Sequence, residues 1–127
     1  MAVTILIVDD DLEFTASTRD ILEAQGYEVI SAPKGSEGFA RATKERPDLI
    51  LLDVMIEDAG AGLDTARKLR DEQRTSKIPV VLLTGIRRAD QLLSSYAPGE
   101  PWPNVKAALE KPVEPEFFIK TIKEVLR

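Results

Sequence analysis

Short, nearly continuous runs of apolar residues alternate with longer amphipathic stretches along the chain. The runs contain many β-branched residues, as expected for strands that are buried on both faces of a parallel sheet. The predicted strands are Val3–Val8, Tyr27–Ile30, Leu49–Asp53, Ile78–Thr84 and Val105–Leu109.

The amphipathic stretches predict helices between and after these strands. The first begins at Asp11, has an apolar stripe that includes Phe14, and ends near Gly26, which has the position of a helix-terminating glycine. The last begins at Pro115, a residue that suits the first position of a helix. The other predicted helices are Ser36–Glu45, about Leu63–Glu72 after a glycine-bearing loop at Ala59–Gly62, and Arg88–Tyr96.

Five strands alternating with five helices make βα units, which require a parallel sheet with right-handed crossovers. The sequence therefore predicts an α/β fold with a central five-stranded parallel sheet and helices on both faces. No repeat, linker or low-complexity segment divides the chain, so we expect one domain over residues 1–127.

The composition excludes several kinds of chemistry. The 127 residues include no cysteine and no histidine, which rules out disulfides, thiolate nucleophiles and a phosphohistidine within the chain. The net charge of −5 argues against broad binding of nucleic acid or of acidic membranes. The first apolar run ends at Asp9, too early for a signal peptide or a membrane span. We therefore expect a soluble cytoplasmic protein.

Polar residues follow four of the predicted strands. Asp9 and Asp10 end the first strand, Asp53 the third and Thr84 the fourth, and Lys111 follows the fifth. Because ligands of open α/β sheets bind at the carboxyl ends of the strands, these side chains are expected to converge at one edge. Each has a simpler interpretation when taken alone, such as a turn hydroxyl or a solvated lysine. Asp11, next in the chain, is best interpreted as a helix N-cap.

The chemistry of such a cluster is restricted. Carboxylates held close together repel one another unless a cation lies between them. With oxygen ligands only, the suitable cation is Mg²⁺, which accepts carboxylates and a phosphate while it keeps several waters. An aspartate beside Mg²⁺ can attack a phosphoryl group, and a hydroxyl and an ammonium group can bind the transferred oxygens.

Four motifs make the chain resemble a response-regulator receiver domain of two-component signalling, of the stand-alone type. They are Ile5–Asp10, Leu51–Met55, Pro79–Gly85 and Lys111–Pro112. The resemblance implies a flavodoxin-like (βα)5 fold and a role in phosphorelay signal transduction. It also implies a phosphoacceptor that catalyses only its own phosphorylation and dephosphorylation, and is not otherwise an enzyme.

The resemblance assigns roles to individual residues. Asp53 corresponds to the phosphoacceptor. Asp9 and Asp10 correspond to the acidic pair that binds Mg²⁺, with Asp10 the more direct ligand. Asp53 and the main-chain carbonyl of Met55 complete the implied set of metal ligands.

The switch residues and the partners are implied in the same way. Thr84 corresponds to the hydroxyl that turns toward the phosphoryl group. Lys111 corresponds to the lysine that pairs with the active carboxylates, and its bond to Pro112 is expected to be cis. The phosphoryl donor is expected to be a histidine kinase or a histidine phosphotransfer protein. A downstream protein target would read the face formed by the fourth helix, the fifth strand and the fifth helix, and the same face would serve a dimer.

The chain departs from the family pattern at Glu57, where a proline is usual, and in two further features. Ala108 stands three residues before Lys111, where the family usually has an aromatic residue that couples to the switch hydroxyl. The connection that includes residues 98–103 is also longer than usual. Trp102 or Tyr96 could replace the missing aromatic residue; alternatively, Trp102 only anchors the long loop.

Two other functions are compatible with this pattern. One is a pseudo-receiver, an interaction module that works without phosphorylation. The other is a phosphatase resembling the haloacid dehalogenases, which would need a second aspartate where this chain has Met55. A cluster of basic residues is interpreted as a solvated helix face and not as a nucleic-acid site; it consists of Arg67, Lys68, Arg70 and Arg74.

Overall fold

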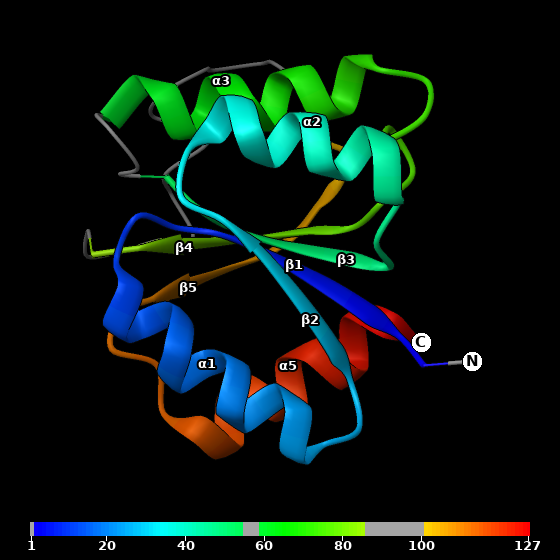
Figure 1. Ribbon diagram of the computed structural model, residues 1–127. Helices are drawn as coiled ribbons and strands as arrows, with labels where there is room; N and C mark the ends of the chain where they lie inside the picture. Colours follow the sequence, from blue (N-terminus) through cyan, green and yellow to red (C-terminus); the bar gives the residue numbers. More distant parts are fainter. Residues whose placement is uncertain (1, 55–58, 86–100) are drawn as a thin grey trace.

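The computed structural model of the protein describes residues 2–54, 59–85 and 101–127 (Figure 1). The elements are β1 (Thr4–Val8), α1 (Leu12–Ala24), β2 (Glu28–Ala32), α2 (Gly35–Glu45), β3 (Leu49–Asp53), α3 (Ala59–Asp71), β4 (Val80–Thr84), β5 (Val105–Glu110) and α5 (Pro115–Leu126). The predicted helix Arg88–Tyr96 lies outside the described residues.

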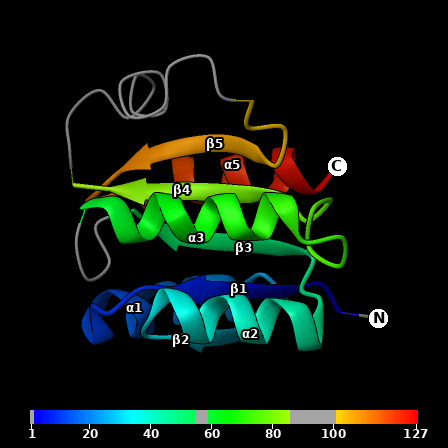
Figure 2. The same cartoon turned by 90° about the horizontal axis from the view of Figure 1, so that it is seen from above.

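The five strands form one parallel sheet in the order β2-β1-β3-β4-β5. Helices α1 and α5 cover one face, and α2 and α3 cover the other (Figures 1 and 2). The predicted fold class, a five-stranded parallel sheet with helices on both faces, is therefore confirmed.

Alternate residues of each central strand pack on opposite faces of the sheet. In β1, Ile5 and Ile7 belong to the core beneath α1 and α5, whereas Leu6 and Val8 belong to the core beneath α2 and α3. All four side chains are fully buried. Both faces of the sheet are covered, so these strands show continuous apolar runs instead of an apolar–polar alternation.

Helix α1 begins and ends with the predicted signals. The Asp11 carboxylate accepts a hydrogen bond of 3.0 Å from the backbone N–H of Phe14 and caps the first turn. At the other end Gly26 has φ of +90°, and the backbone N–H of Tyr27 donates to the Leu22 carbonyl at 3.2 Å. This is a Schellman motif, which explains why β2 begins at Glu28, one residue later than predicted.

Helix α3 begins earlier than the sequence indicated. Residues 59–62 were expected to form a loop, but they belong to the first turn of α3. Gly62 is present because of a close approach: a Cβ atom there would lie 2.4 Å from the Cα and the carbonyl oxygen of Val54. The absence of a side chain lets α3 pack directly against the backbone that follows β3.

Candidate functional site

The register of the sheet brings the predicted carboxylates together. β1 and β3 are neighbours in which Val8 pairs with Leu52, so the aspartates that follow each residue lie side by side at the carboxyl edge. The side chains of Asp9, Asp10 and Asp53 each place a carboxylate oxygen within 4.8 Å of the other two. The first part of the predicted site is therefore assembled by the fold.

Asp9 is firmly held at this edge. Its side chain is buried, and its backbone N–H donates to the Ala32 carbonyl at the end of β2, at 3.1 Å. One carboxylate oxygen accepts a hydrogen bond of 2.9 Å from the backbone N–H of Asp11, and the other accepts one of 2.6 Å from the ammonium group of Lys111. Asp10 is exposed, so its carboxylate faces water.

Lys111 joins the ends of β1, β3 and β5. Its Nζ lies 2.6 Å from Oδ2 of Asp9 and 3.5 Å from Oδ2 of Asp53. Its backbone N–H donates to the carbonyl of Thr84 at 2.7 Å. The peptide bond between Lys111 and Pro112 is cis, as the resemblance implied. Lys111 therefore lies among the carboxylates, and the interpretation as a solvated surface lysine is wrong.

Burial raises the pKa of Asp9 above its ordinary value of 3.8. The hydrogen bonds from Lys111 and from the Asp11 backbone act in the opposite direction, while the nearby charge of Asp53 raises this pKa further. Two carboxylates share one lysine here, so the site holds more negative charge than its own cation neutralises. A further cation at this position would relieve that repulsion.

We expect the Asp9→Asn variant to be more stable than the unchanged protein when no divalent cation is present. A carboxyl group whose pKa is raised on folding contributes stability below its unfolded pKa, and that contribution is lost as the pH rises through the folded value. At neutral pH, Asp9 therefore opposes folding. Thermal unfolding at pH 7.5 in EDTA should give a Tm about 2–5 °C higher for Asp9→Asn.

The matched control is Asp20→Asn on the exposed side of α1, which should leave the Tm unchanged. Lowering the pH toward 4 should shrink the difference between Asp9→Asn and the unchanged protein, because Asp9 then becomes protonated. A Tm difference that stays constant between pH 7.5 and pH 4 would contradict this account of Asp9.

The donor set fits a magnesium ion. The cluster offers only hard carboxylate oxygens, which Mg²⁺ prefers, and the exposed Asp10 leaves one side open to the waters that this ion retains. Asp9, Asp10 and Asp53 are the described residues that would hold it. Met55, whose main-chain carbonyl was predicted as a further ligand, lies outside the described residues.

Thr84 lies at the carboxyl end of β4, between the strands that carry Asp53 and Lys111. Its side chain is fully buried. The register pairs Asp53 with Leu83 on one side and Thr84 with Glu110 on the other. The structure thus places Thr84 at the same sheet edge as the carboxylates and links its carbonyl directly to Lys111.

Trp102 lies away from this edge. The backbone N–H of Val105 donates to the Trp102 carbonyl at 3.1 Å, so Trp102 precedes the amino end of β5, opposite the end that carries Lys111. Its ring contacts two guanidinium groups of α3, Arg70 at 5.1 Å and Arg67 at 5.8 Å from the ring centroid. These contacts support the loop-anchoring interpretation of Trp102; Tyr96 lies outside the described residues.

Three of the four basic residues of the predicted cluster, on α3 and just beyond its end at Asp71, lie beside acidic partners. Three arginines form close ion pairs: Arg67 with Asp64 at 2.7 Å, Arg70 with Asp71 at 2.8 Å, and Arg74 with Glu72 at 2.7 Å. Such pairing reduces the positive potential that a phosphate backbone would require. This arrangement favours the predicted solvated helix face.

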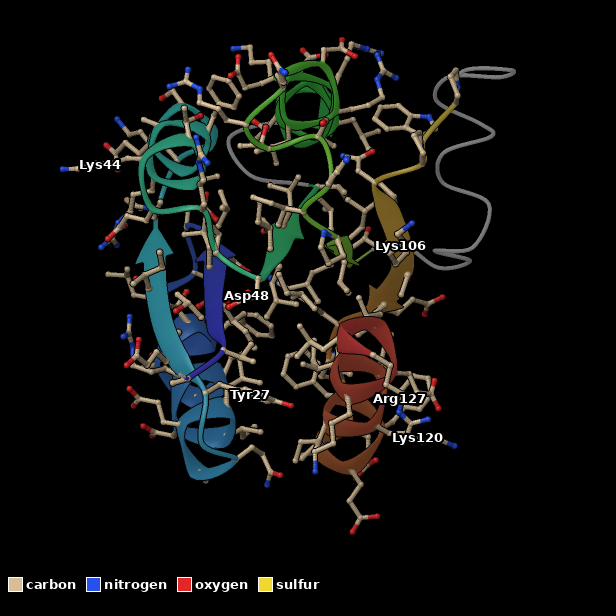
Figure 3. All side chains as sticks on the ribbon, turned by 90° about the vertical axis from the view of Figure 1, so that its right-hand side faces the viewer. Tyr27, Lys44, Asp48, Lys106, Lys120 and Arg127 are labelled. Atoms are coloured by element: carbon tan, nitrogen blue, oxygen red, sulfur yellow. The ribbon has the colours of Figure 1, made fainter. Side chains whose placement is uncertain are left out.

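The opposite edge of the sheet carries a cleft. Figure 3 views this amino edge, with Asp48 near the start of β3 and Arg127 at the end of α5. A cleft of about 390 Å³ there is lined in part by Lys77, Lys106 and Arg127. The Asp48 carboxylate, also in the lining, accepts a hydrogen bond of 2.8 Å from the Thr4 backbone. No acidic cluster forms here among the described residues. This cleft is therefore not the site at which the predicted carboxylates meet.

Three carboxylates and a lysine lie at the carboxyl edge of this parallel sheet. In open α/β sheets this edge is where ligands bind. A family model described as the response regulator receiver domain matches residues 5–123. The chain therefore belongs to the response regulator receiver family.

Relatives of nearly equal length agree with this assignment. Protein PilH of Pseudomonas aeruginosa is 34% identical over 122 residues, which cover 96% of each chain. The polar-differentiation response regulator DivK of Brucella anthropi is 32% identical, and the match covers 99% of this chain and 98% of DivK. Among solved structures, a CheY-like receiver domain protein from Methanospirillum hungatei superposes with a TM-score of 0.83 and is 31% identical, with 99% of this chain and 94% of that chain covered.

None of the described helices combines the length and the apolar character that crossing a bilayer requires.

Proposed function

We propose that the protein accepts a phosphoryl group on Asp53 from a phosphohistidine of a partner protein, in a reaction that depends on Mg²⁺. The observation that carries this proposal is the convergence of Asp9, Asp10, Asp53 and Lys111 at one sheet edge. Membership of the receiver family supports the same function.

The chemical step is an in-line transfer between two heteroatoms. A carboxylate oxygen of Asp53 attacks phosphorus and forms a P–O bond, while the P–N bond to the donor imidazole breaks. The departing nitrogen keeps the electron pair, and the imidazole is neutral after it takes a proton from solvent. The product on this chain is an acyl phosphate.

The other residues of the site would stabilise the negative charge on the phosphoryl oxygens, either directly or by holding Mg²⁺. Asp9 and Asp10, with Asp53, would hold Mg²⁺, which neutralises charge on the phosphoryl oxygens when it is bound. Lys111 already lies 3.5 Å from Asp53, where its ammonium group can bind a transferred oxygen. Thr84 is proposed to offer its hydroxyl to another oxygen and so to bias the face that includes β5 and α5.

The proposed partner is a histidine kinase or a histidine phosphotransfer protein that meets this protein in the cytoplasm. This chain has no histidine, so the phosphohistidine must come from another molecule. Two large apolar side chains among the described residues are exposed, Leu12 at 74% and Phe117 at 55%. They lie in the first turns of α1 and α5, close to the edge that carries the carboxylates, where an approaching protein would cover them.

An interaction module that works without phosphorylation is the second candidate. It is favoured by Ala108, which pairs with Leu82 and packs on the core beneath α2 and α3 in place of an aromatic residue. Amide NMR spectra with and without beryllofluoride and Mg²⁺ separate the two functions. Phosphorylation-dependent switching predicts shifts that extend to α5, whereas shifts confined to the carboxylates support the interaction module.

Phosphorylation by a small donor tests the main proposal. Incubation with acetyl phosphate and Mg²⁺ should add the mass of one phosphoryl group to the intact protein, because Asp53 can attack any activated phosphoryl group that reaches it. The same incubation with EDTA should add none, since the carboxylates then repel the incoming anion. Equal incorporation with and without Mg²⁺ would contradict the proposed role of the acidic cluster.

A further inference from the structure

The ammonium group of Lys111 has a third neighbour besides the two aspartates. Its Nζ lies 4.2 Å from the centroid of the Phe14 ring, over the face of the ring. The side chain of Lys111 is only 20% exposed. The cation is therefore held between carboxylate oxygens and an aromatic face, with little contact with water.

This contact is attractive for a physical reason. The face of an aromatic ring carries partial negative charge, and it draws a cation most strongly when the pair is removed from water. The ring accepts no conventional hydrogen bond from Lys111, so it leaves the N–H groups free to point at Asp9 and Asp53. The ring can thus fix the ammonium group without competing for its donors.

The Phe14 ring is itself well anchored. Its residue lies in the first turn of α1, where the backbone N–H donates to the Asp11 cap at 3.0 Å. On its other sides the ring lines a small crevice of about 30 Å³ between α1 and α5, together with Thr18, Ile21, Val113 and Phe118. Both helices therefore determine where the ring stands.

We propose that Phe14 is a positioning residue for Lys111, an inference that rests on the proposed phosphoacceptor function. The two aspartates that bind Lys111 are the same groups that would bind Mg²⁺, and Asp53 would also carry the phosphoryl group. The attraction of the two aspartates for Lys111 therefore weakens when Mg²⁺ or the phosphoryl group binds. A bound Mg²⁺ would also repel the ammonium group of Lys111. The ring is the partner whose attraction is the same before and after, so it keeps Lys111 at the site.

The simpler role of Phe14 is to fill the crevice between α1 and α5. Phe14→Leu keeps an apolar side chain in that crevice but removes the aromatic face, and Phe14→Tyr restores the face. Fluorination of the ring at position 14 is a finer tool, because it preserves the ring and its position while it withdraws charge from the face. A purely space-filling residue would be insensitive to that series.

The first measurement is made on the metal-free protein and needs no phosphorylation. Protons on the ε-carbon of Lys111 should be shifted upfield by the Phe14 ring in the unchanged protein and in Phe14→Tyr. In Phe14→Leu they should return to the position of a solvated lysine. A Lys111 resonance that is already at the solvated position in the unchanged protein would overturn the inference.

The second measurement is the rate of phosphorylation by acetyl phosphate and Mg²⁺ in proteins carrying phenylalanine with one, two or three ring fluorines at position 14. A cation–π contact of this kind corresponds to about a 2- to 30-fold effect, so the rate should fall stepwise with each added fluorine, by roughly 3- to 10-fold in total. The same series at Phe118, which lines the crevice from α5, should leave the rate unchanged.

The outcomes separate the inference from the proposed function. A rate that is flat across the Phe14 series, in a protein that is phosphorylated normally, overturns the positioning role alone. Absence of phosphorylation in the unchanged protein overturns the proposed function, while the NMR shift of Lys111 still tests its contact with Phe14.

Discussion

The Asp53→Asn variant is expected to gain no phosphoryl group from acetyl phosphate and Mg²⁺. The amide that replaces the carboxylate is a poor nucleophile, and no other described carboxylate is both held by Lys111 and placed at the end of β3. Removing one charge from a cluster that already repels itself should leave the fold intact. The measurement is intact mass after a fixed incubation, with circular dichroism to verify folding.

Asp20→Asn is the matched control for this variant, because it makes the same chemical change on an exposed part of α1. It should incorporate one phosphoryl group at the rate of the unchanged protein. Undiminished incorporation by a folded Asp53→Asn protein would show that another residue is the acceptor, and the proposed mechanism would be wrong.

Gly62→Ala should destabilise the protein strongly, although helix propensity alone predicts the opposite. Alanine in the first turns of α3 would favour the helix by about 1 kcal/mol over glycine. However, the added Cβ would lie 2.4 Å from the backbone of Val54, which cannot move without shifting the end of β3. Overpacking of this kind costs more than the propensity gain, and we expect a net loss of roughly 1–3 kcal/mol in the free energy of unfolding.

Urea unfolding measures this loss, and Gly85→Ala is its control, because a Cβ at Gly85 meets no atom of the described residues within 4 Å. The displaced backbone follows Asp53 directly, so Gly62→Ala should also slow phosphorylation. An increase in stability would show that α3 does not approach Val54 as closely as the structure indicates.

The strands and the edge of the sheet were predictable because burial on both faces leaves a plain sequence signal. Continuous apolar runs located β1, β3 and β4, and their last residues then had to meet at one edge. The sequence pattern alone therefore predicts that Asp9 and Asp53 lie together. The capping of α1 by Asp11 was equally local, since a carboxylate and a backbone N–H three residues later suffice.

The features that were missed depend on contacts between distant segments. Glycines at 60 and 62 are typical of a loop, and only the approach of α3 to Val54 shows why Gly62 belongs to a helix. Phe14 was predicted as part of an apolar stripe, which it is, but its contact with Lys111 joins residues 97 positions apart. The one feature of the sequence that could have indicated this contact is an aromatic residue in the first turn of the helix that follows the acidic pair.

The departure at Ala108 also has a structural context. The residue packs beneath α2 and α3 with Leu82 as its strand partner. Trp102 contacts α3 at the far end of the sheet, so it does not replace an aromatic residue beside Thr84. Signalling through β5 and α5 would then rely on Thr84 and Lys111 themselves.

Direct mapping of the modified residue tests whether Asp53 is the phosphoacceptor. The protein is incubated with acetyl phosphate and Mg²⁺, the acyl phosphate is reduced with borohydride, and the peptides are sequenced by mass spectrometry. Reduction converts a phosphorylated aspartate to homoserine, and we expect homoserine at position 53 and at no other aspartate. Homoserine at Asp9, Asp10 or elsewhere with Asp53 unchanged would contradict this expectation.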